Sequence, residues 1–202
     1  MQAYMKSTMP YYGLRMADVR AISRDVFDGI DLDCASWRKT ILTLWRGAKR
    51  REERYAAMHL IGQRRYRDCL GVDDMPMLEE LVVTGAWWDH VDELAMVIGD
   101  LLRSHPRQMR ALMRRWSTDP NMWKRRVSII CQLRFKRDTD LDLLYANIEP
   151  NLADKEFFIR KAIGWALRQY AWTDPQEVAR YVRANESRLS GLSRREALKN
   201  IG

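Results

Sequence analysis

A carboxylate and an aromatic ring stand one helical turn apart in the segment AWWDHVDELA, residues 86–95. Side chains four positions apart are neighbours on a helix surface, so Trp88 and Asp92 form a pair on one flank of the helix expected over residues 87–103. Trp87 falls inside the apolar stripe of the same helix and is expected in the core. The pair is either a reactive site or a packed tryptophan beside a solvated acid.

A second candidate is an arginine that lies within an apolar stripe. In the helix expected over residues 121–135, Arg126 projects among the residues predicted to be buried, which are Met122, Trp123, Val127, Ile130 and Leu133. Burial of an unpaired charge costs several kcal/mol, so this guanidinium needs an anionic partner. The partner is either an acidic side chain of the protein or a phosphate or carboxylate held in a groove. The residues alone leave both alternatives open.

A third candidate is a tryptophan on a polar helix face. In the helix expected over residues 155–171, Trp165 points away from the apolar stripe, on a face shared with Phe158, Lys161, Arg168 and Trp172. Rings interleaved with cations suit contact with nucleic acid, because rings meet sugar or base and cations meet phosphate. Packing between neighbouring helical repeats is the alternative.

The elements that would carry these residues are helices throughout. Apolar residues recur at steps of three and four, and glycine and proline are scarce. The pattern predicts helices over residues 16–29, 36–46, 51–66, 73–84, 87–103, 106–117, 121–135, 139–149, 155–171, 174–185 and 193–200. Short connections that join a capping residue to a proline or glycine favour antiparallel neighbours.

Pairing these helices gives units of about 35–42 residues, the spacing of HEAT-type α-solenoids. Trp123 follows Trp87 by 36 positions, and Trp165 follows Trp123 by 42. We therefore expect an all-α fold, a solenoid of antiparallel helix pairs, in one domain over residues 1–202. A globular all-α bundle is the alternative architecture.

The charge is unevenly distributed along the chain. The net charge is +8, which suggests a polyanionic partner. Residues 1–67 hold 14 basic side chains (Lys and Arg) and 7 acidic ones (Asp and Glu), and residues 68–103 hold 1 basic and 9 acidic. Residues 104–137 hold 10 basic and 1 acidic, and residues 138–202 hold 10 of each. Basic flanks around an acidic block would hold nucleic acid and leave a negative site between them. Charged faces that balance one another after folding are the alternative.

Several classes of protein do not fit the sequence. No apolar run approaches the length of a membrane span, and no secretory signal opens the chain. Three widely spaced cysteines, Cys34, Cys69 and Cys131, favour reduced thiols in a cytoplasmic protein over a disulfide framework. The histidines are scattered and no paired-cysteine motif exists, so no metal site is expected.

The chain resembles the DNA alkylation repair enzyme family, the AlkD-like DNA glycosylases built of HEAT-like repeats. The resemblance is carried by AYMKSTMPYYGLRMADVRAI, LEELVVTGAWWDHVDELA, NMWKRRVSIICQL, KEFFIRKAIGWALRQYA and SGLSRREALKN, which occur in the family's order and span nearly the whole chain. The combination of WWDxVD with FFIxKAIGWALR is specific. The implied fold is an α-solenoid that wraps duplex DNA with a basic concave face.

The resemblance also implies an activity and the residues that perform it. The activity is hydrolysis of the N-glycosidic bond of cationic N3- or N7-alkylated purines, with no metal or organic cofactor. Trp88 and Asp92 match the family's active-site pair, and Trp165 matches its second groove tryptophan. Arg126 matches a phosphate-binding arginine, with Arg125, Lys161 and Arg168 as further DNA contacts. Tyr4 matches an aromatic contact near the N-terminus.

The implied chemistry needs a carboxylate near the deoxyribose. A cationic base already leaves readily, and bond cleavage develops oxocarbenium character on the sugar, which Asp92 would stabilise while it orients the attacking water. Trp88 and Trp165 would flank the sugar. The expected partner is double-stranded DNA containing alkylated bases, bound by a monomer that needs no protein partner and is nucleoid-associated when on DNA.

One departure from the family pattern concerns the N-terminus. Family members carry a helical segment before the part that matches AYMK, and this chain begins almost at that match. The expectation is that the family's first helix is absent and that the ordering of Tyr4 suffers. A catalytically silent helical-repeat module that binds DNA or protein is the alternative to a glycosylase.

Overall fold

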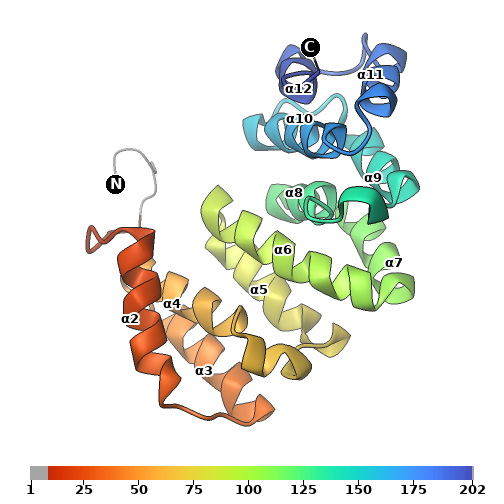
Figure 1. Ribbon diagram of the computed structural model, residues 1–202. Helices are drawn as coiled ribbons and strands as arrows, with labels where there is room; N and C mark the ends of the chain where they lie inside the picture. The colour runs from red at the N-terminus through yellow and green to blue at the C-terminus, as the bar shows by residue number, and fades with distance from the viewer. Residues whose placement is uncertain (1–8, 202) are drawn as a thin grey trace. The chain divides into compact units, whose positions relative to one another are not determined.

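The computed structural model describes residues 9–201, and the part of the chain so described consists of helices, turns and loops without a β-strand. The prediction of an all-α fold is confirmed (Figure 1). The chain forms two compact units, one ending at Met77 and the other beginning at Leu78. The boundary falls within helix α5 (Met75–Gly85). Tyr4 lies outside the described residues, and the single domain over residues 1–202 stays a prediction.

Over residues 9–74, the described part of the first unit holds three α-helices and two short 3-10 helices. They are α2 (Met16–Asp28), α3 (Cys34–Gly47), α4 (Arg51–Ile61), η1 (Arg64–Cys69) and η2 (Val72–Asp74). Helix α4 packs on both α2 and α3. Trp37, Ile41 and Trp45 recur every four residues on α3 and are buried, so they form the core of this unit.

Helix α4 ends earlier than the helix expected over residues 51–66. Gly62 caps it, and the chain tightens into η1, which runs back toward α3. The buried Trp37 indole donates to the Leu60 carbonyl at 3.1 Å, and the Tyr66 hydroxyl donates to the Ile30 carbonyl at 3.0 Å. The first bond ties α3 to α4, and the second holds η1 against the α2–α3 connection, so polar atoms at the edge of the core are satisfied.

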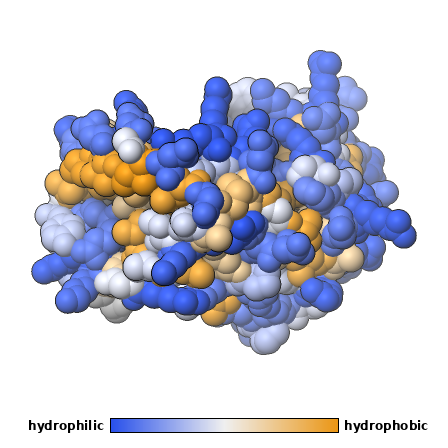
Figure 2. Space-filling view, turned by 90° about the horizontal axis from the view of Figure 1, so that it is seen from below, coloured by the Kyte–Doolittle hydropathy of each residue, from blue (hydrophilic) through white to orange (hydrophobic). Residues whose placement is uncertain are grey.

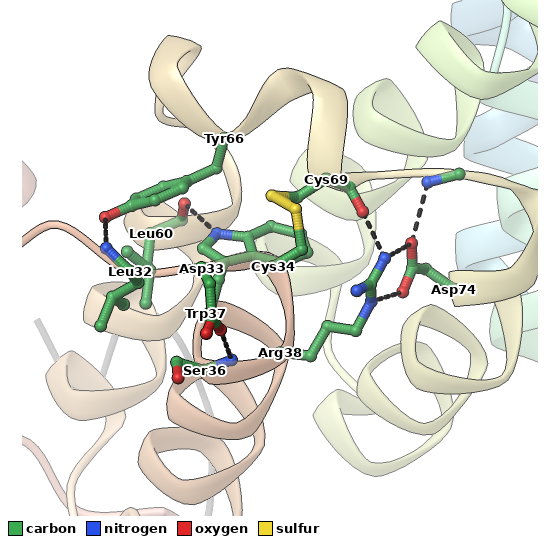
Figure 3. The surroundings of a disulfide bond; sticks show 11 residues. Leu32, Asp33, Cys34, Ser36, Trp37, Arg38, Leu60, Tyr66, Cys69 and Asp74 are labelled. Carbon is green, nitrogen blue, oxygen red and sulfur yellow. Dashed lines mark hydrogen bonds and ion pairs between the residues drawn. A yellow bond between two sulfur atoms is a disulfide. The ribbon is translucent and has the colours of Figure 1, made fainter.

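A disulfide joins Cys34, the first residue of α3, to Cys69, the last residue of η1 (Figure 3). The expectation of reduced thiols is therefore wrong for this pair. The return of η1 brings the two Cα atoms to 5.1 Å, within the range that a disulfide spans. Their separation of 35 positions gave no sign of that proximity. Cys131 is a free and buried thiol.

The bridge is accompanied by a polar tie on the same segment. Arg38 donates to both carboxylate oxygens of Asp74, at 2.5 and 3.2 Å, and to the Cys69 carbonyl at 2.5 Å (Figure 3). Asp74 in turn accepts from the Gly71 amide at 2.8 Å. The disulfide and this arginine together fix the end of η1 and the connection after it.

The second unit stacks helices in two layers. After α5 come α6 (Trp88–Ser104), α7 (Pro106–Trp116), α8 (Met122–Ile130), η3 (Lys136–Asp138), α9 (Leu141–Ile148), η4 (Glu149–Asn151), α10 (Phe157–Ala171), α11 (Pro175–Ala184) and α12 (Gly191–Ala197). Contacts run from α6 to α8, from α8 to α10 and from α10 to α12, which form one layer. In Figure 1, α7, α9 and α11 lie along the other side. This is the stacking of helix pairs expected from the repeat spacing.

Helix α8 is shorter than the helix expected over residues 121–135. Asn121 caps its start by accepting from the Trp123 and Lys124 amides, but the helix stops at Ile130. The buried Gln132 amide then bonds both backbone groups of Asp140, at 2.8 and 3.0 Å. These two side-chain bonds replace the hydrogen bonds that a further helical turn would make, and they bring the two ends of the α8–α9 loop together.

The surface carries apolar side chains among polar ones. On the face seen in Figure 2, hydrophobic residues lie in several groups between hydrophilic ones. On α2 the exposed apolar side chains include Ile22 and Val26, which are 51% and 55% exposed. Within the described residues, no helix is long and apolar enough to cross a membrane.

Candidate functional site

The site begins at a strained turn between α5 and α6. Only Ala86 and Trp87 separate Gly85, the end of α5, from Trp88, the start of α6. Ala86 has φ of +40°, in the left-handed region that residues other than glycine rarely adopt. Trp87 is extended and caps α6. Such outliers often lie beside functional sites, and the amino-acid pattern gave no signal for this one.

Asp92 lies one turn inside α6 and is bound by Arg126 of α8. Nε and Nη2 of Arg126 donate to the two carboxylate oxygens of Asp92, at 2.6 and 2.7 Å. The third bond runs from Nη1 to the Phe158 carbonyl on α10, at 2.6 Å. Side-chain exposure is 4% for Arg126 and 15% for Asp92, so three successive helices of one layer meet in a largely buried ion pair.

Of the two partners that the sequence left open for Arg126, the structure supplies the acidic side chain. A bidentate arginine–carboxylate pair is among the strongest hydrogen-bonded contacts in proteins. A guanidinium has five N–H groups, and three are engaged here. The role of Arg126 as a phosphate contact stays a prediction, and only its two remaining N–H groups could donate to a phosphate.

Two opposing influences act on the Asp92 carboxyl. Burial raises the pKa of Asp92 above that of an ordinary aspartate, and the Arg126 guanidinium opposes that rise. Nearby Asp89 adds a smaller rise to the Asp92 pKa. The site therefore holds a carboxylate that solvent reaches poorly and whose charge depends on one arginine.

Aromatic rings surround the ion pair. The Trp87, Trp123 and Phe158 rings contact one another with centroids 5.1 to 6.3 Å apart, and the Arg126 guanidinium lies 5.9 Å from the Phe158 ring centroid. Such packing lowers the local polarity around the charges. Trp123 is buried as predicted, whereas Trp87 is only half-buried. Trp87 falls short of the core because it is the cap that precedes α6 and its ring leaves the helical stripe.

The two tryptophans predicted for catalysis have surroundings unlike those of this cluster. Trp88 starts α6, one turn before Asp92, and Trp165 lies on α10 two turns after Phe158. Both are half-buried, and within residues 9–201 neither ring stacks on another ring or under a cation. The convergence of Trp88 and Trp165 with the ion pair on one groove stays a prediction.

The cations predicted to hold DNA are engaged within the protein. Arg125 donates to Asp154 at 3.0 Å and to the Asp119 carbonyl at 2.8 Å, and its side chain is 17% exposed. Lys161 and Arg168 of α10 share one partner, Glu196 of α12, at 2.6 and 2.8 Å. The sequence gave no sign of that shared carboxylate.

Glu196 is consequently held in its charged form. Lys161 chiefly lowers the pKa of Glu196, and Arg168 and Lys199 lower it further. DNA phosphates would have to compete with this carboxylate for the two α10 cations. Their role in DNA binding stays a prediction.

Metal ligands are not assembled in this region. Within residues 9–201, no three histidine, cysteine, aspartate or glutamate side chains group as they would around a metal ion.

Two of three comparisons with known proteins find a match, and both matches are to the same kind of protein. Among curated proteins, no similar sequence is found. A solved structure described as a predicted DNA alkylation repair enzyme from Enterococcus faecalis is similar to this chain, with a TM-score of 0.85 and 28% identity. The match covers 100% of this chain and 93% of that one. The family model described as DNA alkylation repair enzyme matches residues 1–201. The chain therefore belongs to the DNA alkylation repair enzyme family.

Proposed function

We propose that this protein is a DNA glycosylase that hydrolyses the N-glycosidic bond of cationic, N3- or N7-alkylated purines in duplex DNA. Membership of the DNA alkylation repair enzyme family supports the substrate. The observation that supports the reaction is that the Asp92 carboxylate is largely buried and is bound by Arg126 beside an aromatic cluster. A fixed negative charge of low exposure is what an oxocarbenium-like sugar requires for stabilisation.

The reaction breaks the bond between C1′ of deoxyribose and the alkylated base, and water supplies the oxygen. The bonding electrons leave with the cationic base, which becomes neutral, so no strong acid at the base is required. Positive charge grows on the sugar, and Asp92 opposes it electrostatically and accepts a proton from the attacking water. The two half-buried tryptophans, Trp88 and Trp165, offer ring faces to the sugar.

Arg126 acts through Asp92 in this proposal. Its two bonds orient the carboxylate and oppose the rise of the Asp92 pKa. Its hydrogen bond to the Phe158 carbonyl connects α10, which carries Trp165, to the Asp92–Arg126 pair. A lesion phosphate is a further ligand for the N–H groups of Arg126 that Asp92 and Phe158 leave unused.

The remaining parts of the proposal concern the setting. Arg125, Lys161 and Arg168 would contribute affinity that does not depend on base sequence. The protein would act as a monomer, in the cytoplasm and on nucleoid DNA, with duplex DNA along a basic concave face and no cofactor.

The decisive experiment measures release of N7-methylguanine from duplex DNA by the wild type and by Asp92→Asn. The variant keeps the shape of the side chain but removes its charge, and we expect a fall in release of about a hundredfold or more. Asp100→Asn, an exposed acid on the same helix, is the matched control and should leave release unchanged. Equal rates for wild type and Asp92→Asn would contradict the role of Asp92.

A catalytically silent DNA-binding module is the second candidate, and one observation favours it. Asp92 is already neutralised by Arg126, as it would be in a purely structural ion pair. That module predicts tight binding of methylated duplex without release by the wild type. Loss of thermal stability in Asp92→Asn with no change in chemistry would point the same way.

A further inference from the structure

A polar hollow lies in the second unit, beside the C-terminal ends of α6 and α10, whereas Asp92 and Phe158 lie near the N-terminal ends of these helices. It has a volume of about 550 Å³ and is lined by Arg103, Arg134, Phe135, Lys136, Arg137, Asp138, Trp172 and Thr173. Arg103 stands at the C-terminal end of α6, and Trp172 caps the C-terminal end of α10. The volume falls within the range of pockets for small organic ligands, about 300–1,000 Å³.

The hollow carries a surplus of positive charge. Four cationic side chains face one carboxylate, that of Asp138. Arg103 lies 3.8 Å from Asp138 and covers the Phe135 ring at 4.4 Å. The other three cations, Arg134, Lys136 and Arg137, are exposed and have no carboxylate within 4 Å among residues 9–201. An anion in the hollow would therefore meet cations without displacing an ion pair.

Trp172 forms the aromatic wall of the hollow. It is 72% exposed, more than Phe157 at 52% or Tyr12 at 60%. An indole left in water forgoes the free energy that burial of a large ring provides. Within the described residues no ring stacks on it and no cation lies over its face, so the core does not explain its position.

The loop under the hollow is held in a fixed shape. Lys136 has φ of +54°, in the left-handed region, and its carbonyl accepts from the Thr139 hydroxyl at 2.7 Å. Gln132 clamps Asp140 from the other side of the loop. A lysine held in this conformation between such bonds marks a preorganised segment.

Cations near helix C-termini also stabilise the helix dipole, and Arg103 serves that role here. The dipole gives no reason for an exposed indole to lie among them, or for three further unpaired cations. A ligand with a flat ring and an anionic group accounts for both features together.

We propose that the hollow binds one unpaired nucleotide of single-stranded DNA. The base stacks on Trp172, and the adjoining phosphate is held by Arg134, Lys136 and Arg137. Stacking on an exposed ring beside a cationic groove is the usual mode of recognition for single strands and tolerates any base. The proposal concerns lesion-free DNA and other residues than the Asp92 site, so it stands or falls independently of the glycosylase.

The test is fluorescence anisotropy with a labelled, lesion-free oligothymidine of about six nucleotides. A second strand of the same length carries abasic sugars in place of thymidines, so that charge is kept and the rings are lost. Three variants are compared with the wild type. Trp172→Ala removes the ring. A double variant, Arg134→Ala with Arg137→Ala, removes two positive charges from the hollow. The control double variant, Arg107→Ala with Arg183→Ala, removes two positive charges from exposed positions elsewhere.

We expect Trp172→Ala to weaken oligothymidine binding about fivefold or more and to leave abasic-strand binding unchanged. The Arg134 and Arg137 double variant should weaken both strands more than the Arg107 and Arg183 double variant does. The proposal is overturned if Trp172→Ala binds both strands like the wild type. It is equally overturned if the two double variants are alike. Because all five side chains are exposed, circular dichroism and thermal melting should match the wild type.

Discussion

At the scale of single residues, the chemistry depends on the charge of Asp92. Burial raises the pKa of Asp92 and Arg126 opposes that rise. The reactive form is the carboxylate, so its population falls as pH falls through this raised pKa. As the pH is lowered, the rate of base release should begin to fall at a pH higher than about 4, the value at which an ordinary aspartate titrates. A pH–rate profile under single-turnover conditions measures this limb, and its coincidence with an ordinary aspartate would contradict the assignment.

Arg126 should control where that limb lies. Arg126→Lys keeps a positive charge but loses the bidentate hydrogen bonds that lower the Asp92 pKa, so the rise caused by burial is opposed less. We expect the acid limb to move to higher pH. Arg125→Lys is the matched control, because Arg125 pairs with Asp154 and not with Asp92. Equal shifts for the two variants would show that the effect is not carried by the pair.

The pattern in the sequence identified Arg126 but not its partner. A cation in an apolar stripe contradicts helix amphipathicity, and that contradiction is visible in one helix. Asp92 lies 34 positions away on another helix, and a local pattern carries no information about which acid will face it. The same limit applies to Lys161 and Arg168 of α10, whose shared partner Glu196 lies on α12, two helices later.

At the scale of elements, α10 and α12 approach one another across Gly164. A Cβ at this position would lie 2.9 Å from the Ser193 carbonyl oxygen and 3.2 Å from the Ser193 Cα. We expect Gly164→Ala to destabilise the protein by about 1–3 kcal/mol, because backbone atoms cannot make room for a methyl group. Urea denaturation measures the change.

Gly47→Ala is the control for this substitution, since nothing lies within 4 Å of its position. It should leave stability nearly unchanged or raise it slightly. A Gly164→Ala protein as stable as the wild type would show that α12 can move away from α10.

The helices themselves were largely predictable, and their ends were not. Periodicity placed a helix at each α-helix between residues 9 and 201, because burial of one face repeats every three to four residues. The end of α8 was missed since Gln132 replaces helical hydrogen bonds with side-chain bonds to Asp140. The end of α4 was missed because the chain turns into η1 to meet α3. Both ends are set by tertiary contacts.

At the scale of the whole molecule, the disulfide closes a long loop in the first unit. The Cys34–Cys69 bridge spans 35 positions, and restriction of the unfolded chain by such a loop contributes roughly 3–4 kcal/mol. We expect the double variant of Cys34→Ser and Cys69→Ser to unfold at lower urea concentration than the wild type. Treatment of the wild type with reductant should reproduce the loss, and reductant should leave the double variant unaffected.

The bridge also determines how the protein responds to electrophiles. The chain has three cysteines, two of which are bonded to each other, and the third, Cys131, is 1% exposed with its pKa raised by burial to about 12. The thiolate is the form that methylating agents attack. The folded, oxidised protein therefore presents no thiolate to them.

Iodoacetamide should accordingly label none of the cysteines in the native protein, two after reduction, and three after reduction and unfolding, as counted by mass spectrometry. Labelling of the native chain would contradict this. In a member of a family that repairs alkylated DNA, the cysteines would thus be protected from the kind of reagent that damages DNA.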